Sequence, residues 1–198
     1  VYFYENLLQC YVLLKDFKSA EKMLDKRIKK YPTLYNYQVD RAYLYNLQNI
    51  ADKRDELFKS LTELKTNSID EIDVLANAFL KRRFYDQAIL TYLNARNRLN
   101  DKTLFAYNLS ELYFQSGKLN EASEELMIIL EENDYMMDEI KNRLIMAYKN
   151  DEQYKMLTNI YIQIPPAGGI FYWDKQYILS GIKTITGVFT KPVVHISP

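Results

Sequence analysis

The chain offers few side chains of the types that perform covalent or metal chemistry. It has one cysteine, Cys10, and one histidine, His195, at opposite ends of its 198 residues. A cysteine nucleophile needs a nearby base, and a zinc or disulfide site needs several Cys or His residues at short spacing. We therefore expect Cys10 to be a packing residue and His195 to have no catalytic role. The chain is predicted to be no enzyme, with no cofactor and no metal.

The remaining charged and polar motifs favour structural interpretations. The sequence holds no glycine-rich phosphate loop and no His-Glu-x-x-His motif. The acidic run 70–73 and the basic run 81–83 fall at predicted helix ends, where charges of these signs stabilise the helix dipole. Asn108 begins a glycosylation-type triplet, but it lies within a predicted helix.

The composition excludes several classes of partner. Lys and Arg number 26 and Asp and Glu number 26, so the formal net charge is zero. Without a basic excess we expect no nucleic-acid partner. No apolar run approaches the ~18 residues that a membrane span requires. Only five Gly and five Pro are present, which favours helices over loops.

The sequence repeats with a period of 34 residues. Residues one period apart share their character in three columns, one aromatic, one mostly small and one large and apolar. These columns are Tyr11, Tyr45, Phe79 and Tyr113; Leu8, Ala42, Ala76 and Ser110; and Leu24, Phe58, Tyr92 and Leu126. A further column, Ala20, Ala88 and Ala122, is broken in its second unit by Arg54. We expect that unit to pack more loosely.

Apolar spacing within each unit predicts two helices. We place them near 2–14, 18–30, 35–48, 51–65, 69–82, 85–98, 103–115, 119–132, 137–149 and 151–163. Ser68-x-x-Glu71 reads as a capping box, and Asp86 and Asn120 are candidate N-caps of second helices.

The unit resembles the tetratricopeptide repeat (TPR), a pair of antiparallel helices. Its pattern is clearest in Tyr4-x2-Leu7-Leu8-x2-Tyr11 followed by Phe17-x2-Ala20-x3-Leu24, and again from Ala106 to Leu126. The resemblance implies an all-α, TPR-like α-solenoid of about four to five helix-turn-helix repeats. The repeats lie near 1–34, 35–68, 69–102 and 103–136, with a degenerate unit at 137–163. Together they make a predicted repeat domain over 1–163.

A divergent tail follows at 164–198, with four of the five prolines and four of the five glycines. One interpretation gives it a last covering helix at 171–182 and strand or irregular structure at 185–196. The other is that the tail is unrelated to the repeats.

In TPR arrays the first helices line a concave groove that binds a peptide or a partner helix, and the resemblance implies that use here. The groove residues would be aromatic, amide and modestly acidic side chains. They are Tyr2, Glu5, Gln9, Asn36, Tyr43, Asn46, Asp70, Asp73, Asn77, Lys81, Tyr107, Glu111, Phe114 and Gln115. Such a set predicts a non-catalytic protein–protein interaction scaffold.

The charge of this set bears on the partner. Chaperone-binding TPR proteins hold a C-terminal carboxylate with Lys, Asn and Arg, whereas the corresponding positions here are Glu5, Gln9, Asp40, Asp70 and Val74. Because acidic groups repel a carboxylate, we expect a neutral or basic protein or peptide instead.

Two other functions stay open, a structural spacer in a longer array and a helical regulatory module of an enzyme whose catalytic domain lies outside this chain. Because the helical pattern is already running at Tyr2, we expect the true N-terminus to be missing. Localisation and oligomeric state are therefore not predicted. A loose similarity to large multi-repeat bacterial TPR proteins leaves both cytoplasm and cell envelope open.

Overall fold

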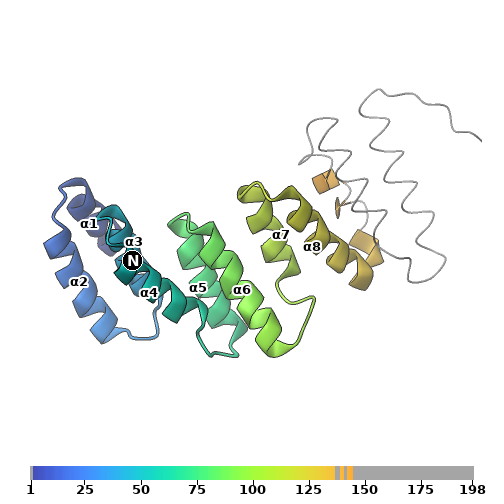
Figure 1. Ribbon diagram of the computed structural model, residues 1–198, viewed down its shortest axis with the longest axis horizontal. Helices are drawn as coiled ribbons and strands as arrows, with labels where there is room; N and C mark the ends of the chain where they lie inside the picture. The colour runs from blue at the N-terminus through green and yellow to red at the C-terminus, as the bar shows by residue number, and fades with distance from the viewer. Residues whose placement is uncertain (1, 137–138, 141, 145–198) are drawn as a thin grey trace, which may run out of the picture. The chain divides into compact units, whose positions relative to one another are not determined.

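The computed structural model describes residues 2–136, 139–140 and 142–144 (Figure 1). Over these residues the regular structure is helical, with no strand. The helices are α1 (Tyr2–Leu13), α2 (Phe17–Lys30), α3 (Asn36–Leu47), α4 (Ala51–Thr62), α5 (Ile69–Lys81), α6 (Tyr85–Leu99), α7 (Ala106–Gln115), α8 (Leu119–Glu132) and the 3₁₀ turn η1 (Asp134–Met136). The predicted all-α, TPR-like fold is confirmed, and the first eight predicted helices each have a counterpart.

The later predictions fall largely outside the described residues. Residues 139–140 and 142–144 are helical, within the helix predicted at 137–149. The helix predicted at 151–163, the boundary after 163 and the tail 164–198 lie outside the part of the chain that the structure describes.

The chain divides into two compact units, Val1–Phe105 and Ala106–Pro198. Unit 1 contains the antiparallel pairs α1/α2, α3/α4 and α5/α6, and successive pairs are in contact through α2 with α3, α3 with α5 and α4 with α6 (Figure 1). We call α1, α3 and α5 the layer of first helices and α2, α4 and α6 the layer of second helices; α3 contacts α5 and α4 contacts α6, while α2 packs on α3. In unit 2, α7 packs along α8.

The repeat columns supply the core of both units. Ala20, Ala88 and Ala122 are fully buried, and so are Leu24 and Leu126 from the large apolar column. The mostly small column, Leu8, Ala42, Ala76 and Ser110, is buried throughout. Small side chains allow paired helices to approach closely, while the larger ones fill the space between pairs.

Arg54 is accommodated in the small-residue column of the second pair by reaching outward. Its guanidinium donates to Asn46 Oδ1 on α3 at 2.9 Å and to Asp55 at 2.8 Å. The guanidinium also lies 5.8 Å from the ring centroid of Phe58. The charge thus stays hydrated and paired while the alkyl chain packs, as long cationic side chains commonly do.

The turn within each pair is the same left-handed turn, one period apart. Lys15, Asn49, Arg83 and Gly117 have φ of 56°, 58°, 60° and 77°. The residue after each one donates its N–H to a carbonyl five residues earlier, as in Asp16 to Tyr11 and Lys118 to Tyr113. This is the Schellman arrangement, which satisfies carbonyls at the end of a helix. The period is therefore present in the backbone as well as in the side chains.

The predicted start of one helix is confirmed, and the predicted N-caps of two others are wrong. Ser68 caps α5, accepting from the Glu71 N–H, while Thr66 Oγ1 bridges the Ser68 N–H and the Glu71 carboxylate. The residues at the N-cap positions of α6 and α8 are Phe84 and Lys118, so Asp86 and Asn120 lie inside the first turn instead. The left-handed turn fixes where each second helix starts. The N-caps of α6 and α8 therefore lie two residues before the predicted ones, Asp86 and Asn120.

Candidate functional site: the inner face of unit 1

The predicted groove residues of unit 1 lie on α1, α3 and α5, the layer of first helices. We call the surface of these three helices the inner face. Two cross-helix contacts bind the layer together: Tyr4 Oη of α1 donates to Asp40 Oδ2 of α3 at 2.7 Å, and Lys81 Nζ of α5 donates to Glu5 Oε2 of α1 at 2.7 Å. The helices of three successive repeats thus meet on one side of the unit.

Arg82, the residue that ends α5, is the centre of this network. Its Nε donates to Asp40 Oδ1 at 2.7 Å and its Nη2 to Glu5 Oε1 at 2.9 Å. Its guanidinium lies 4.8 Å from the ring centroid of Tyr43, in cation–π geometry. One side chain therefore contacts α1 and α3 at once.

The network is substantially buried and electrically balanced. Asp40 is 5% exposed, an unusual place for a carboxylate unless it is paired. Burial raises the pKa of Asp40 against the opposing effect of Arg82, and burial beside Asp40 raises the pKa of the Tyr4 hydroxyl. For Arg82 burial acts to lower the pKa, but the carboxylates of Asp40 and Glu5 outweigh it and raise the pKa. Two acids and two bases leave no net charge within the network.

Two of the predicted groove residues, Glu5 and Lys81, belong to this network, so their charges are already paired. Glu5 and Lys81 are ion-paired with each other, and Glu5 is also paired with Arg82. Sequence reasoning did not assign Arg82 and Tyr4 to the inner face. Their partners lie far away in sequence, at separations of 77 residues for Arg82 with Glu5 and 36 for Tyr4 with Asp40. No local pattern reveals such pairs.

The other predicted residues of unit 1 have varied surroundings. Gln9 and Asp70 are exposed, and Asn36 and Tyr43 are half-buried. Asp73 accepts hydrogen bonds from Tyr92 and Asn77, and Asn46 accepts one from Arg54 on α4. The side chain of Tyr2 is not among those that the structure describes.

The inner face also carries apolar side chains that the protein leaves in contact with solvent. Leu13 on α1 is 75% exposed, Leu47 on α3 is 38% exposed and Val74 on α5 is 50% exposed. Each belongs to a first helix. Apolar side chains at the surface are common singly, but a set on neighbouring helices offers contact area to a partner.

Unit 2 has a cationic contact of its own among the predicted groove residues. Arg143 lies 4.5 Å from the ring centroid of Tyr107 and donates to the Tyr107 hydroxyl and to Glu111. Its Nε also donates to Glu139 Oε1 at 3.3 Å. Phe114 is half-buried and Gln115 is exposed.

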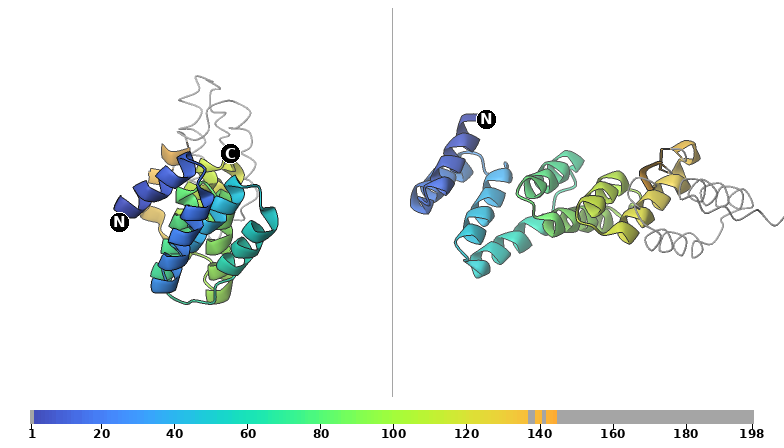
Figure 2. Two further views of the ribbon diagram at one scale, coloured as in Figure 1. Left: turned by 90° about the vertical axis from the view of Figure 1, so that its left-hand side faces the viewer. Right: turned by 90° about the horizontal axis from the view of Figure 1, so that it is seen from above.

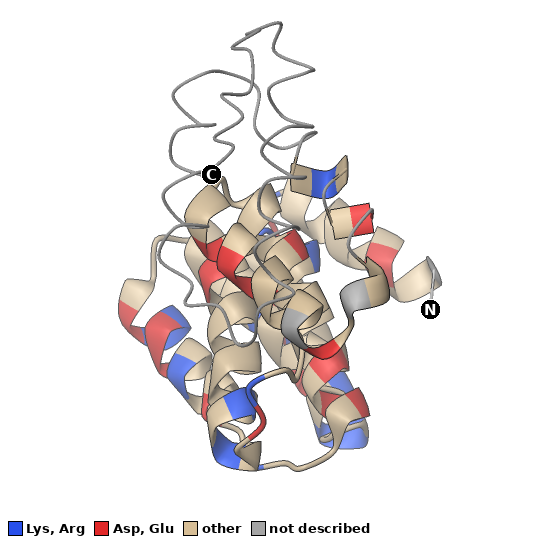
Figure 3. Ribbon diagram, turned by 90° about the vertical axis from the view of Figure 1, so that its right-hand side faces the viewer, with Lys and Arg blue, Asp and Glu red and all other residues tan. Residues whose placement is uncertain are grey.

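The described helices carry charged side chains of both signs. Acidic and basic positions alternate along several of the helices (Figure 3). A group of three or more His, Cys, Asp or Glu able to hold a metal ion is absent from the described residues. Among those same residues, no helix combines the length and apolar character needed to cross a membrane.

The fold and the inner face define an all-α protein built from TPR-like helix pairs. No protein-family model matches the chain, and no curated protein is similar to it. Among solved structures the chain is similar to one described as Naa15/Naa10 bound to HypK-THB, with 16% identity and a TM-score of 0.42. The match covers 92% of this chain and 28% of that chain.

Proposed function

We propose that the protein is a non-catalytic interaction scaffold that binds a peptide or a helix of a partner protein on the inner face of unit 1. The observation that carries the proposal is the composition of that face. Leu13, Leu47 and Val74 remain exposed on the three first helices that the Arg82 network joins. Exposed apolar side chains beside rigid polar groups are typical of binding surfaces.

The charges favour a neutral or basic partner over an acidic one. Lys81 and Arg82 are already paired with Glu5 and Asp40, so a carboxylate of a ligand would have to displace one of these two acids. Asp70 and Asp73 on α5 add negative charge to the same face. A Lys or Arg of the partner would meet these acids with complementary charge.

The test is a selection from a displayed library of random 16-residue peptides, with the full 198-residue chain as bait. We expect enriched peptides that combine apolar residues with Lys or Arg. We further expect the variant Leu47→Arg/Val74→Arg to weaken their binding by at least about tenfold, equivalent to ~1.4 kcal/mol. Both side chains are exposed, so the substitutions leave the core intact.

The matched control is Leu90→Arg, which places the same charge at an exposed leucine of α6, a second helix. If the inner-face variant leaves binding unchanged and Leu90→Arg abolishes it, the binding site lies on the second helices and the proposal is wrong. Enrichment of acidic peptides would contradict the charge argument. A selection without any enriched peptide would favour the spacer function.

A further inference from the structure

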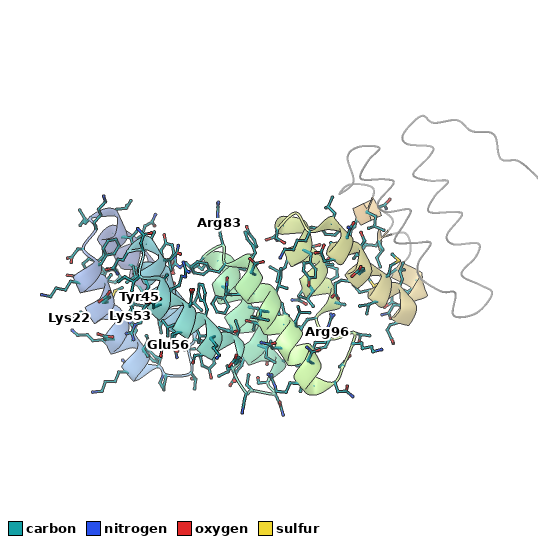
Figure 4. All side chains as sticks on the ribbon, in the orientation of Figure 1. Lys22, Tyr45, Lys53, Glu56, Arg83 and Arg96 are labelled. Carbon is teal, nitrogen blue, oxygen red and sulfur yellow. The ribbon has the colours of Figure 1, made fainter. Side chains whose placement is uncertain are left out.

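The solvent-facing surface of α2, a second helix, carries a row of lysines. Lys18, Lys22 and Lys29 are separated by four and seven residues, which places them on one face of the helix. That face lies opposite Ala20 and Leu24, which are fully buried. All three lysines are exposed (Lys22 is labelled in Figure 4). We call these three residues the α2 stripe.

The acidic side chains of α2 do not neutralise the α2 stripe, because they contact α3 or the residue that ends it. Glu21 Oε1 accepts a hydrogen bond from Gln48 Nε2 at 3.1 Å, and Asp25 is ion-paired with Arg41. Within the part of the chain that the structure describes, no lysine of the stripe forms an ion pair. Like charges four residues apart, as at the first two positions of the stripe, destabilise a helix. An opposite charge from outside α2 would remove this repulsion.

The same three positions one period later are acidic. They are Asp52 and Glu56 in α4 and Glu63, the residue that ends α4. All three are exposed, and we call them the α4 stripe. Helices α2 and α4 are the second helices of the first two pairs (Figure 2). The two stripes therefore present opposite charges at identical spacing.

This face of the second helices stays in solvent inside the array as well as at its end. Helix α6 is in contact with α4 of the preceding pair. Its residues at the same three positions, Asp86, Leu90 and Asn97, are nevertheless exposed, Leu90 by 45%. The packing of one repeat on the next therefore does not use this face, and a partner that binds it must come from outside the array.

We propose that the protein forms a two-fold symmetric dimer in which the α2 stripe of each copy binds the α4 stripe of the other. In a two-fold interface each contact occurs twice, so both stripes of both copies are neutralised together. The helices align in parallel, because an antiparallel alignment would reverse the spacing of four and seven residues and mismatch the middle pair. The resulting pairs are Lys18 with Asp52, Lys22 with Glu56 and Lys29 with Glu63.

The α4 stripe is the reason to assign a second copy and not a broad anionic partner. A bilayer or a nucleic-acid duplex lying over α2 would also meet the acids of the neighbouring second helix, and like charges repel. A second copy presents acids to α2 and lysines to α4 at the same time. Because the paired side chains are exposed and charged, salt screens their attraction, and the dimer is expected to be weak and to dissociate as the salt concentration rises.

A charge exchange tests the dimer, with sedimentation equilibrium of the full 198-residue chain at about 50 mM NaCl, where exposed charges are weakly screened. The variants Lys22→Glu/Lys29→Glu and Glu56→Lys/Glu63→Lys each bring like charges together in their own dimer. We expect each variant alone to raise the dimer dissociation constant at least about tenfold. In an equimolar mixture both stripe contacts are attractive again, so the constant should return to within about threefold of wild type.

The matched control is Lys65→Glu/Lys102→Glu, which reverses two exposed lysines outside both stripes and should leave the dimer unchanged. A wild-type chain that is monomeric at low salt would overturn the proposal. So would a dimer that both charge exchanges leave intact, or two monomeric variants that do not associate when mixed. These outcomes do not depend on the inner face, because Leu47 and Val74 are unchanged in every variant.

Discussion

At the scale of single residues, Arg82 is the side chain that joins the three first helices of unit 1. Its guanidinium contacts Asp40, Glu5 and the Tyr43 ring, and so connects α5 to α1 and α3. Its neighbour Arg83 has an exposed side chain that points away from the ribbon (Figure 4). Two adjacent arginines of the same sequence motif thus have different roles, one inside a network and one in solvent.

Replacing Arg82 should destabilise the protein strongly. We expect Arg82→Ala to lower the free energy of unfolding by about 3 kcal/mol, because it leaves the buried Asp40 carboxylate without its cation. Urea denaturation followed by circular dichroism measures the change. Arg83→Ala is the control and should change the free energy by no more than about 0.5 kcal/mol. Equal effects of the two variants would contradict the network.

The pKa of Glu5 predicts a dependence of stability on pH. Burial acts to raise this pKa, but the hydrogen bond from Lys81 and the charge of Arg82 outweigh burial and lower it. A carboxyl whose pKa is lower in the folded than in the unfolded state stabilises fully above its unfolded pKa of about 4.3, and this stabilisation is lost as pH falls through the folded value.

Wild type should therefore exceed Glu5→Gln in stability at pH 7, by up to about 1 kcal/mol for a partly exposed ion pair. The difference should become smaller as the pH falls below the unfolded pKa of about 4.3. Urea denaturation of both proteins over a series of pH values below 7 measures it. A difference that persists unchanged at low pH would mean that Glu5 acts by packing and not by charge.

At the scale of elements, the turn within each helix pair is the most regular feature. The left-handed position is filled by Lys15, Asn49, Arg83 and Gly117 in successive pairs. Only glycine adopts this conformation without steric penalty, while Asn tolerates it and longer side chains do so less well. The turns of the four repeats therefore differ in strain although their geometry is the same.

This difference can be measured by exchanging glycine at two turns. Gly117→Ala should lower the free energy of unfolding by about 1 kcal/mol through backbone strain alone, because a Cβ there meets no atom within 4 Å. Arg83→Gly should raise it by up to about 1 kcal/mol. Thermal and urea denaturation report both changes. Should Arg83→Gly destabilise the protein instead, its side chain must contribute more than the strain it imposes.

At the scale of the whole molecule, unit 1 consists of three helix pairs. Besides the contacts between successive pairs, ion pairs join the first helix pair directly to the third. Glu5 in the first pair meets Lys81 and Arg82 in the third. A simple repeat protein is stabilised by contacts between nearest neighbours. The additional link from first to third pair should make unit 1 more cooperative than such a sum.

Truncation tests this cooperativity. We expect residues 1–105 to unfold in one sharp urea transition, because they retain all three pairs and the whole network. Residues 1–68 retain Glu5 and Asp40 without either cation and should lose most of their helical signal in circular dichroism. Equal stability of the two fragments would show that the link from first to third pair contributes little.

The amino-acid sequence by itself determined the first eight helices, the period and the core columns. These features depend on side-chain spacing over a few residues and on recurrence at 34, both of which can be read along the chain. The N-caps predicted for α6 and α8, Asp86 and Asn120, are wrong. The left-handed turn that all four pairs share fixes where those helices begin.

The tertiary structure alone decided which side chains meet. The acidic residues Glu5 and Asp40 were expected to give the inner face its charge, but Arg82 and Lys81 neutralise both. The pairing of Glu5 with Arg82 spans 77 residues and depends on how three helices are packed, so no spacing rule in the sequence encodes it. Short-range periodicity specifies elements, whereas the charge of a surface depends on contacts that only packing brings about.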